Sequence, residues 1–347
     1  MERVIIVGGG VAGLTCLNAL LDCGISAILF EGGTIGNPKM CGEFIAPSAV
    51  SLLQHWGISA VQSIEQVSFM TGNKKLNLQL PSCAGAFARN DAELLLAERA
   101  KAKGGQIREN SPIQNIISNA DSYTFQLASG ETIETAHAII ATGKLMNAPG
   151  KIDFPYYGIK AHFPVVAQAN ALLMYSTHDA YFGLVPVSKT TSNFACLVKS
   201  ATIKKAGSGR DFFNELVRNH SALQAINEKV DLTKINLLES KLPHFGFKKR
   251  PNLPNIFWIG DALVSFPPAI GYGFAHSVDS AMVAVEYFLK NNSNGHAQIS
   301  RQLVKSKLKL GNIIHKLLLN PSYAALVLPL FQKTPWVSNL LMKKIGY

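Results

Sequence analysis

Apolar and polar positions change their period several times along the 347 residues. An apolar run from Val4 to Val7 is followed by apolar positions at helical spacing from Val11 to Leu21, and a second apolar run ends at Phe30. Short apolar runs between turn residues predict buried strands, whereas apolar positions three and four apart predict an amphipathic helix. The amino-terminal stretch therefore predicts a strand–helix–strand unit.

The rest of the chain repeats these two patterns. Helices are expected at residues 49–56, 91–103, 211–219 and 274–289. After residue 293 the spacing stays helical, with breaks expected at Pro321, Pro329 and Pro335. Strands are expected where apolar and polar residues alternate, or where short apolar runs meet turn residues: 64–80, 112–135, 138–141, 151–203 and 255–259.

This order of elements predicts an α/β protein, a Rossmann-like nucleotide domain with an inserted antiparallel-sheet substrate domain and a C-terminal helical tail. The regions that combine strands with helices flank the antiparallel segment on both sides. We expect the nucleotide domain at 1–70, 87–150 and 250–292, the substrate domain at 71–86 and 151–249, and the tail at 293–347.

A glycine-rich turn joins the first predicted strand and helix. Gly8, Gly10 and Gly13 have the spacing G-x-G-x-x-G. Gly8 permits a tight turn, Gly10 has no Cβ to block a pyrophosphate, and Gly13 lets the helix pack closely on the sheet. The first helical residues, Val11 and Ala12, offer free N–H groups and the positive end of the helix dipole to phosphates. The turn predicts a dinucleotide site.

Glu31 selects among dinucleotides. It ends the second strand, where a carboxylate can accept the hydroxyls of an adenosine ribose and would repel a 2′-phosphate. FAD or NAD is therefore expected, and NADP is not. Gly271 and Gly273 also have G-x-G spacing, but they follow Pro267-Pro268 and lack the third glycine, so we expect one dinucleotide bound in this way.

Composition points to an ordered, reduced protein. Hydrophobic residues make up 48% and charged residues 16%, which argues against disorder. The five cysteines show no C-x-x-C spacing, so neither a disulfide framework nor a metal site is expected. The first strand begins almost at residue 1 and no apolar run reaches 18 residues, so we expect a cytoplasmic protein without a leader or a spanning helix.

Positive charge is concentrated in the tail. The net charge is +11, Glu286 is the last carboxylate side chain, and nine Lys and Arg residues follow it. The rest of the chain has 24 basic and 22 acidic side chains. The tail is either a solvated helical cap on the core or a peripheral contact with the inner face of an anionic membrane. Nucleic-acid binding is disfavoured, because the aromatic residues are not interleaved with the cations.

Six elements in this order resemble the FAD-dependent oxidoreductase superfamily of p-hydroxybenzoate hydroxylase and the geranylgeranyl reductases. They are the glycine turn with Glu31, KMCGEF at 39–44, Arg89-x-Asp91, IIATG at 139–143, IGDA at 259–262 and PPAIGYG at 267–273. The resemblance implies FAD as the cofactor and a FAD-binding domain of the glutathione-reductase type.

The resemblance also implies roles for residues along the cofactor. Asp261, after Gly260 at a strand end, would accept a hydrogen bond from a ribityl hydroxyl, and Arg89 would reach the pyrophosphate or the pocket entrance. Gly271 and Gly273 would let the next helix approach the flavin. The residues expected near the adenosine end are Ala141, Thr142 and Gly143.

Catalytic and substrate residues are expected in two places. In geranylgeranyl reductases a Cys-Gly in the KMCGEF-like loop lies beside the flavin, so Cys41 would donate a proton or fill space. Glu43 would be a proton donor, a loop cap or an exposed residue. Tyr181 and Pro267 are expected in the substrate pocket, and His162 is expected to be structural.

The resemblance leaves the reaction open. We favour a monooxygenase that hydroxylates a largely apolar or aromatic small molecule through a flavin C4a-hydroperoxide. The alternatives are saturation of a lipid or polyketide double bond, as in geranylgeranyl reductases, and a non-catalytic protein that binds a lipid or prenylated partner. NADH or NADPH would be a transient electron donor, but Lys144 stands in a segment that usually carries an acid for NADPH contacts, which leaves the donor open.

Overall fold

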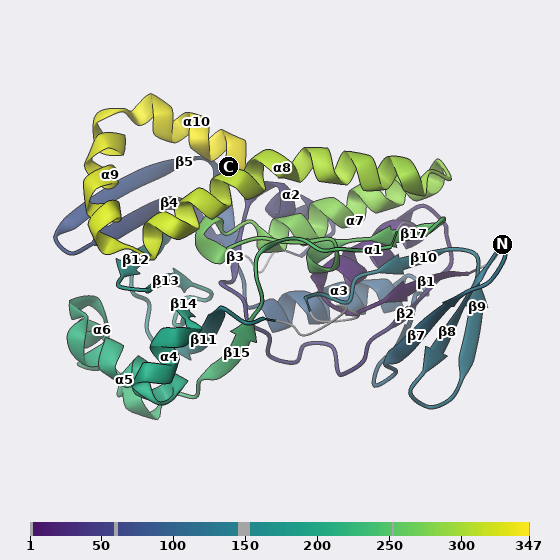
Figure 1. Cartoon of the computed structure of the whole chain (residues 1–347), viewed down its shortest axis with the longest axis horizontal. Helices are drawn as coiled ribbons and strands as arrows, with labels where there is room; N and C mark the ends of the chain where they lie inside the picture. The colour runs from purple at the N-terminus through teal and green to yellow at the C-terminus, as the bar shows by residue number, and fades with distance from the viewer. Residues whose placement is uncertain (1–2, 59–61, 145–152, 252, 347) are drawn as a thin grey trace.

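The computed structural model describes residues 3–58, 62–144, 153–251 and 253–346. One part of the fold is a five-stranded parallel sheet in the order β17-β10-β1-β2-β6. Helices α1 and α3 pack together, α7 packs on α1, and α2 lies against α7 (Figure 1). The bounds are β1 Val4–Val7, α1 Val11–Asp22, β2 Ala27–Phe30, α2 Pro47–His55, α3 Arg89–Ala102, β6 Gln106–Arg108, β10 Ala138–Ile140, β17 Ile256–Trp258 and α7 Gly273–Leu289.

A three-stranded antiparallel sheet packs against this parallel sheet. It consists of β7 (Ile113–Ser118), β8 (Tyr123–Leu127) and β9 (Thr132–Thr135). Phe125 of β8 is fully buried in one apolar cluster with Ile5 and Phe30 of the parallel sheet. The amino-terminal strand–helix–strand unit and the α/β class predicted from the sequence are confirmed.

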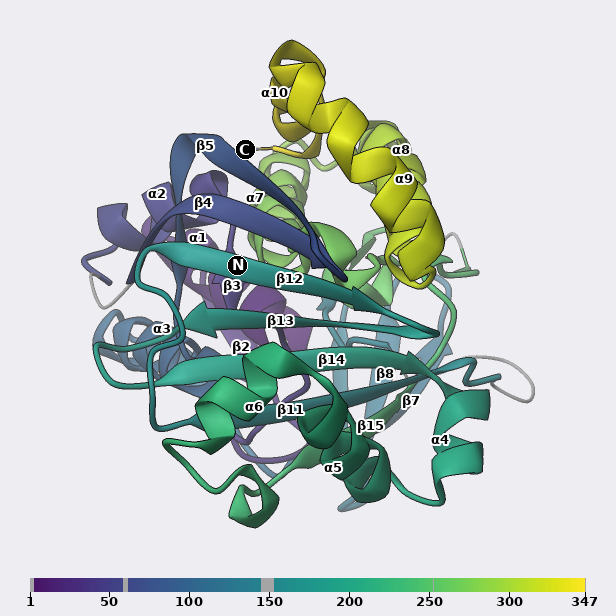
Figure 2. The same ribbon diagram turned by 90° about the vertical axis from the view of Figure 1, so that its left-hand side faces the viewer.

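An eight-stranded, mostly antiparallel sheet forms the other half of the molecule, in the order β15-β11-β14-β13-β12-β4-β5-β3 (Figure 2). Its core contains Phe163, Phe182, Phe194 and Phe213, all fully buried. The strands are β3 Phe44–Ile45, β4 Gln62–Thr71, β5 Lys74–Ala86, β11 Tyr156–Phe163, β12 Ala171–Thr177, β13 Ala180–Pro186, β14 Ser192–Lys199 and β15 Leu238–Leu242.

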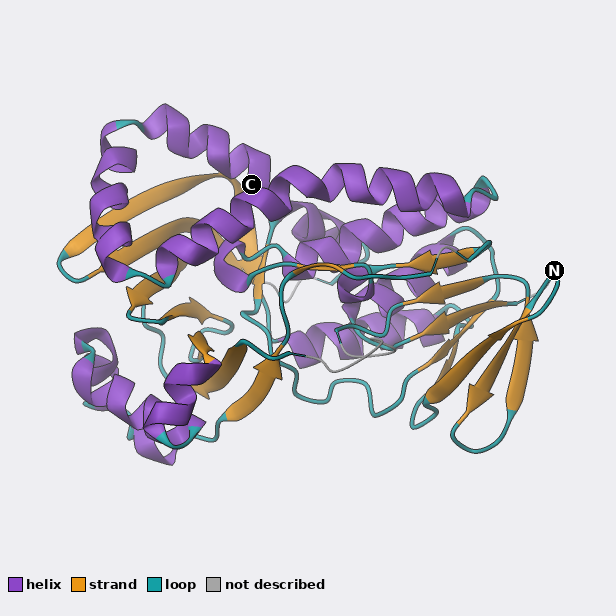
Figure 3. Ribbon diagram, viewed as in Figure 1, coloured by secondary structure: helices purple, strands orange, loops and turns teal. Residues whose placement is uncertain are grey.

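Strand β4 pairs with β5 and with β12, so the domain boundary expected at residue 70 falls inside a strand. The substrate sheet begins earlier than expected, because its edge strand β3 starts at Phe44, the last residue of KMCGEF. Three helices cover one side of this sheet (Figure 3). They are α4 Ser200–Ala206, α5 Gly209–Asn219 and α6 Ser221–Asn227, and the short strands β16 Gly246–Phe247 and β18 Val264–Ser265 form a separate pair.

The C-terminal region consists of α8 (Ser293–Leu318), α9 (Pro321–Lys333) and α10 (Pro335–Ile345). Pro321 and Pro335 each occupy the first position of a helix, where the missing N–H has no cost. The break expected at Pro329 is wrong, because α9 continues through it with its inner face buried. Among the described residues, no single helix is both long and apolar enough to cross a membrane; α8 and α9 reach that criterion only together, and they are bent by 119° at their junction.

Candidate cofactor and substrate site

The glycines of the turn between β1 and α1 have two different roles: two are required by close backbone packing, and one borders open space. Gly8 has a φ of +110°, and a Cβ added there would lie 2.5 Å from the carbonyl oxygen of Ala141. A Cβ on Gly13 would clash with the carbonyl oxygen of Gly8. A Cβ on Gly10 would come no closer than 3.5 Å to another described residue, the guanidinium of Arg89. Gly8 and Gly13 are therefore required by the backbone, whereas the space above Gly10 is available to a ligand.

Glu31 lies at the carboxyl end of β2, against this turn. Its Oε2 accepts a hydrogen bond from the N–H of Gly9 at 2.5 Å, and its Oε1 accepts one from Gly33 at 3.0 Å. A Cβ on Gly9 would lie 2.9 Å from the Cβ of Glu31. Gly9 is thus a third required glycine, which the G-x-G-x-x-G spacing did not single out. The ribose contact of Glu31 stays a prediction.

One cavity joins the amino end of α1 to the segment that follows β17. Its wall includes Gly10, Val11 and Ala12 on one side and Asp261 on the other. Gly260 brings the two together, because a Cβ on it would lie 2.9 Å from the Cβ of Ala12. Further wall residues are Arg89, Ala141, Gly143, Gly271 and Gly273, while Thr142 is half-buried between Ala141 and Gly143. An extended dinucleotide therefore fits the residues present.

The amino end of α7 faces the same cavity. Gly271 has a φ of +58° and ends a short 3-10 turn, and α7 begins two residues later at Gly273. His276, one turn into α7, is buried and its Nε2 lies 3.2 Å from the carbonyl oxygen of Gly260. Burial lowers the pKa of His276. It therefore holds α7 to the Asp261 turn as a neutral ring.

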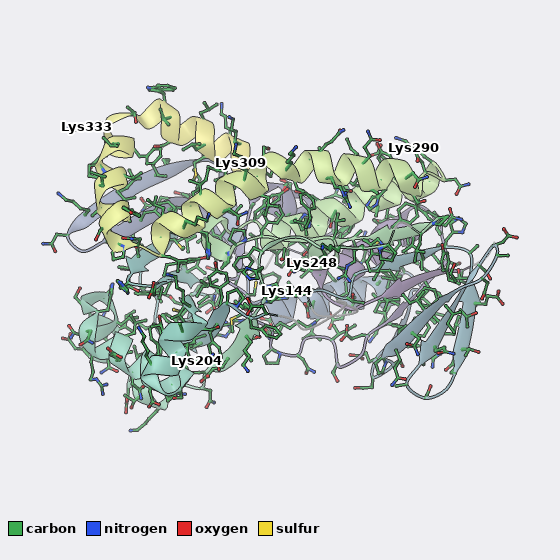
Figure 4. The ribbon with its side chains drawn as sticks, viewed as in Figure 1. Lys144, Lys204, Lys248, Lys290, Lys309 and Lys333 are labelled. Carbon is green, nitrogen blue, oxygen red and sulfur yellow. The ribbon has the colours of Figure 1, made fainter. Side chains whose placement is uncertain are left out.

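Buried and half-buried charges surround the centre of the cavity. Arg89 Nε lies 2.9 Å from Glu93 Oε1, and Lys39 Nζ lies 2.8 Å from Glu93 Oε2. Glu93 is fully buried and pairs with both cations, and the Arg89 guanidinium borders the open space over Gly10. Lys144 Nζ lies 3.7 Å from Asp261 Oδ2. Lys248 also lies within electrostatic range of Lys144 and Asp261, in the middle of the molecule (Figure 4).

Glu43 is not exposed, and it lies among charged partners from two other elements. It has a φ of +57° and is fully buried. Its Oε1 lies 2.5 Å from Lys160 Nζ and accepts the backbone N–H of Arg89 at 2.9 Å, and its Oε2 lies 2.6 Å from His162 Nε2. Burial alone would raise the pKa of Glu43, but His162 and Lys160 outweigh it and lower that pKa. Glu43 is therefore an ionised group that connects its loop to β11 and α3, closest to the expected loop cap.

Cys41 and Gly42 line the cavity, where the resemblance placed them. The Cys41 Sγ accepts the backbone N–H of Glu43 at 3.3 Å. Asn193 of β14 donates to the carbonyl oxygens of Cys41 at 3.3 Å and Gly42 at 2.9 Å. The loop is thus fixed to the substrate sheet at the thiol residue and at the residue that follows it.

The substrate half of the cavity is mainly apolar. Tyr181 lies in its wall, and its hydroxyl is 3.0 Å from Nδ1 of His315 on α8. Burial raises the pKa of Tyr181 and lowers that of His315 to about 4, so both groups are neutral. Other wall residues are Met40, Phe44, Leu172, Met174, Leu197, Leu242 and Phe245.

Pro267 does not line this cavity. It is buried near α8, where a Cβ on Gly311 would lie 3.2 Å from its ring. Pro268, the next residue, lies in the wall instead. Two adjacent prolines cannot be assigned to opposite sides of a loop from sequence alone, because the assignment depends on where α8 packs.

Several residues that shape the site were not predicted from the sequence. Glu93 could have been found, because it lies four residues after Arg89 on the same helix face. Lys160 and Asn193 gave no such signal. They reach the loop only because β11 and β14 lie side by side in the sheet.

The glycine turn and the strand-end Asp261 meet on one cavity between a parallel sheet and an antiparallel sheet, and this combination defines an FAD-binding oxidoreductase. The chain belongs to the FAD binding domain family, which matches residues 1–301. The resemblance to FAD-dependent enzymes drawn from the sequence is confirmed.

Solved structures share the fold at low sequence identity. The flavin-dependent brominase Bmp2 superimposes with a TM-score of 0.81 at 13% identity, covering 99% of this chain and 93% of its own. PqsL of P. aeruginosa, in complex with 2-aminobenzoylacetate, gives 0.76 at 14% identity, covering 93% and 98%. A geranylgeranyl bacteriochlorophyll reductase-like protein from Thermoplasma acidophilum gives 0.72 at 17% identity, covering 99% of each chain. No curated protein matches this chain by sequence.

Proposed function

We propose that this FAD-binding protein is a monooxygenase that acts on a largely apolar or aromatic small molecule. The proposal rests on the ionisation and the hydrogen bonding of the acidic groups beside the substrate half of the cavity, Glu43 and Tyr181. Glu43 is buried and held ionised by Lys160 and His162. The Tyr181 hydroxyl is hydrogen-bonded to Nδ1 of His315. A reductase that saturates a double bond needs a positioned acid to protonate the substrate carbon, and neither group suits that task.

FAD supplies two-electron redox chemistry, and the chain provides binding and environment. The free N–H groups at the start of α1, with Arg89, are suited to the pyrophosphate. Asp261 is suited to a ribityl hydroxyl. The dipole of α7 favours negative charge near its amino end, and the walls around Leu172, Met174 and Phe245 exclude water from the reacting atoms.

The substrate class follows from the same walls. The side chains of the substrate half are mostly aliphatic, aromatic or methionine, with few groups that could pair with a charge. PqsL, which shares the fold, has been crystallised with a small aromatic acid, 2-aminobenzoylacetate. NADH or NADPH is the proposed class of electron donor.

Reduction of a carbon–carbon double bond is the second candidate. One observation favours it: Cys41 and Gly42 border the cavity, as the Cys-Gly pair does beside the flavin in the reductases. The Cys41 thiol is the remaining proton donor in this loop. The two reactions differ in their need for oxygen, so one experiment separates them.

The experiment incubates the FAD-loaded protein with NADH, NADPH or dithionite and an apolar cell extract, under ¹⁸O₂ and under nitrogen. A monooxygenase yields a product that carries one heavy oxygen atom, and only under ¹⁸O₂. A product that gains two hydrogen atoms under nitrogen would contradict the proposal and establish the reductase. Absence of any product with all three reductants would favour the non-catalytic lipid-binding protein. Cys41→Ser should leave the oxygenated product unchanged and should abolish a reductase that uses the thiol.

A further inference from the structure

The outer faces of the last two helices are apolar where a solvated helix would be polar. Tyr323, Leu326 and Leu330 form one stripe on α9 and are 62%, 69% and 60% exposed. Trp336 and Leu340 lie one turn apart on α10 and are 70% and 49% exposed. Leu303 and Ile313 on α8 are also exposed. Most of the exposed large apolar side chains among the described residues therefore lie on these three helices.

Positive charge accompanies this surface. No carboxylate follows Glu286, so the three helices contain no acid. Figure 4 shows Lys309 and Lys333 on the C-terminal helices, at the top of the view, and Lys204 at the opposite side of the molecule. Exposed cations on α8, α9 and α10 are Arg301, Lys305, Lys309, Lys316, Lys333, Lys343 and Lys344. A surface of this kind complements an anionic bilayer, into which its aromatic and aliphatic side chains can insert.

An apolar cavity of about 710 Å³ lies beneath the same helices. Its floor is the substrate sheet, with Phe69 of β4 and Leu76 and Leu78 of β5. Tyr323 and Leu326 belong both to its wall and to the exposed stripe, so the cavity opens at the apolar surface. Figure 2 shows α9 and α10 beside β4 and β5.

This second cavity adjoins the cofactor cavity. Leu172, Met174, Pro268 and Gly271 line both. These four residues form the boundary between the two cavities, near the amino end of α7. A chain too long for the cofactor cavity has room in the second one.

We propose that α8–α10 dock on an anionic membrane and that the cavity beneath them holds the apolar chain of an amphiphile drawn from that membrane, a substrate role that rests on the function proposed above. Each cation close to an anionic surface strengthens binding about five-fold. The apolar stripe supplies the insertion that charge alone does not.

Membrane docking is tested by sedimentation of the FAD-loaded protein with vesicles. We expect binding to equal parts of phosphatidylglycerol and phosphatidylcholine, little binding to phosphatidylcholine alone, and weaker binding in high salt. The double variant Leu330→Glu, Trp336→Glu should bind more than about ten-fold less, whereas Ile117→Glu, Phe247→Glu, which alters exposed apolar residues elsewhere, should bind normally. Lys343→Gln, Lys344→Gln should weaken binding, and Lys204→Gln, Lys205→Gln should not.

Three results would overturn docking. They are equal binding to neutral and anionic vesicles, unchanged binding by the Leu330→Glu, Trp336→Glu variant with unchanged FAD content, and a dimer in lipid-free solution that this variant dissociates. The last result would show that the surface binds a second copy of the chain.

The chain-binding cavity is tested without membranes, with the fluorescent fatty acid cis-parinaric acid. We expect saturable binding that Leu78→Trp, which fills the cavity, reduces more than about ten-fold. The neighbouring Gln79→Trp, whose side chain is exposed on the other face of β5, should bind normally. Equal binding by both variants would refute the cavity. Because the probe needs no turnover, a failed oxygenation experiment leaves this result intact.

Discussion

Glu43 is a fully buried carboxylate with partners from two other elements. Its carboxylate meets Lys160, His162 and the amide of Arg89, which come from β11 and α3. Its positive φ adds local strain that these contacts must outweigh. The position of the cavity wall formed by Cys41 and Gly42 therefore depends on the contacts of Glu43.

Glu43→Gln should destabilise the fold strongly. The amide keeps the shape but leaves Lys160 buried without a negative partner, and breaking a buried pair in this way costs about 3–5 kcal/mol. Urea unfolding of the FAD-free protein at neutral pH measures the change. Glu131→Gln, in the exposed pair with Arg108, should leave the unfolding curve almost unchanged. Identical curves for the two variants would mean that the Glu43 cluster does not hold the loop.

Site residues that are close together in the sequence could be predicted from it. Partners that are far apart in the sequence could not. The glycine turn depends on neighbours within one strand–helix unit, so its spacing carried the information. Lys160 lies 117 positions after Glu43, and the two meet only through sheet pairing and docking. For the same reason, the sequence analysis placed Pro267 in the cavity wall, where the structure has Pro268.

At the scale of elements, α8 ties the tail to both halves of the molecule. It packs on α7, and His315 reaches Tyr181 in the substrate half. His296 and His315 are both buried, and burial lowers the pKa of each to about 4. Helix α8 is therefore part of the core and also supports the outer surface. The sequence analysis treated a cap on the core and a membrane contact as alternatives for the tail.

The two histidines of α8 predict loss of stability in mild acid. In the unfolded chain they take up protons below a pKa of about 6.5, whereas the folded protein does so only near 4. Stability is therefore complete above about pH 6.5 and falls as the pH drops towards 4, by up to about 3 kcal/mol for each histidine. Urea midpoints at about pH 7.5 and about pH 5 measure this fall.

His296→Phe should flatten that pH dependence, because it removes one buried titrating group among the rings of Phe257 and Tyr287. His178→Asn, at an exposed position, should retain the full slope. A parent protein equally stable at both pH values would contradict the burial of α8.

At the scale of the whole molecule, element types could be predicted more fully than their arrangement. The spacing of apolar residues and the positions of turn residues located most strands and helices. An element that buries one face repeats its apolar residues at the period of a helix or of a strand. The extent of the substrate sheet was underestimated, since β3 and β4 join it through pairing partners more than 20 residues away. The continuation of α9 through Pro329 was missed, because buried Ala324 and Leu328 hold the helix there.

The central claim is that FAD lies extended from the glycine turn of α1 to Asp261 after β17. Equilibrium titration with FAD, followed by the change in flavin absorption and fluorescence, tests it most directly. The parent protein should bind one FAD, and Gly10→Val and Asp261→Ala should each fold normally but bind FAD more than about ten-fold more weakly. A parent protein that binds no FAD, or two variants that bind it as tightly as the parent, would contradict the account.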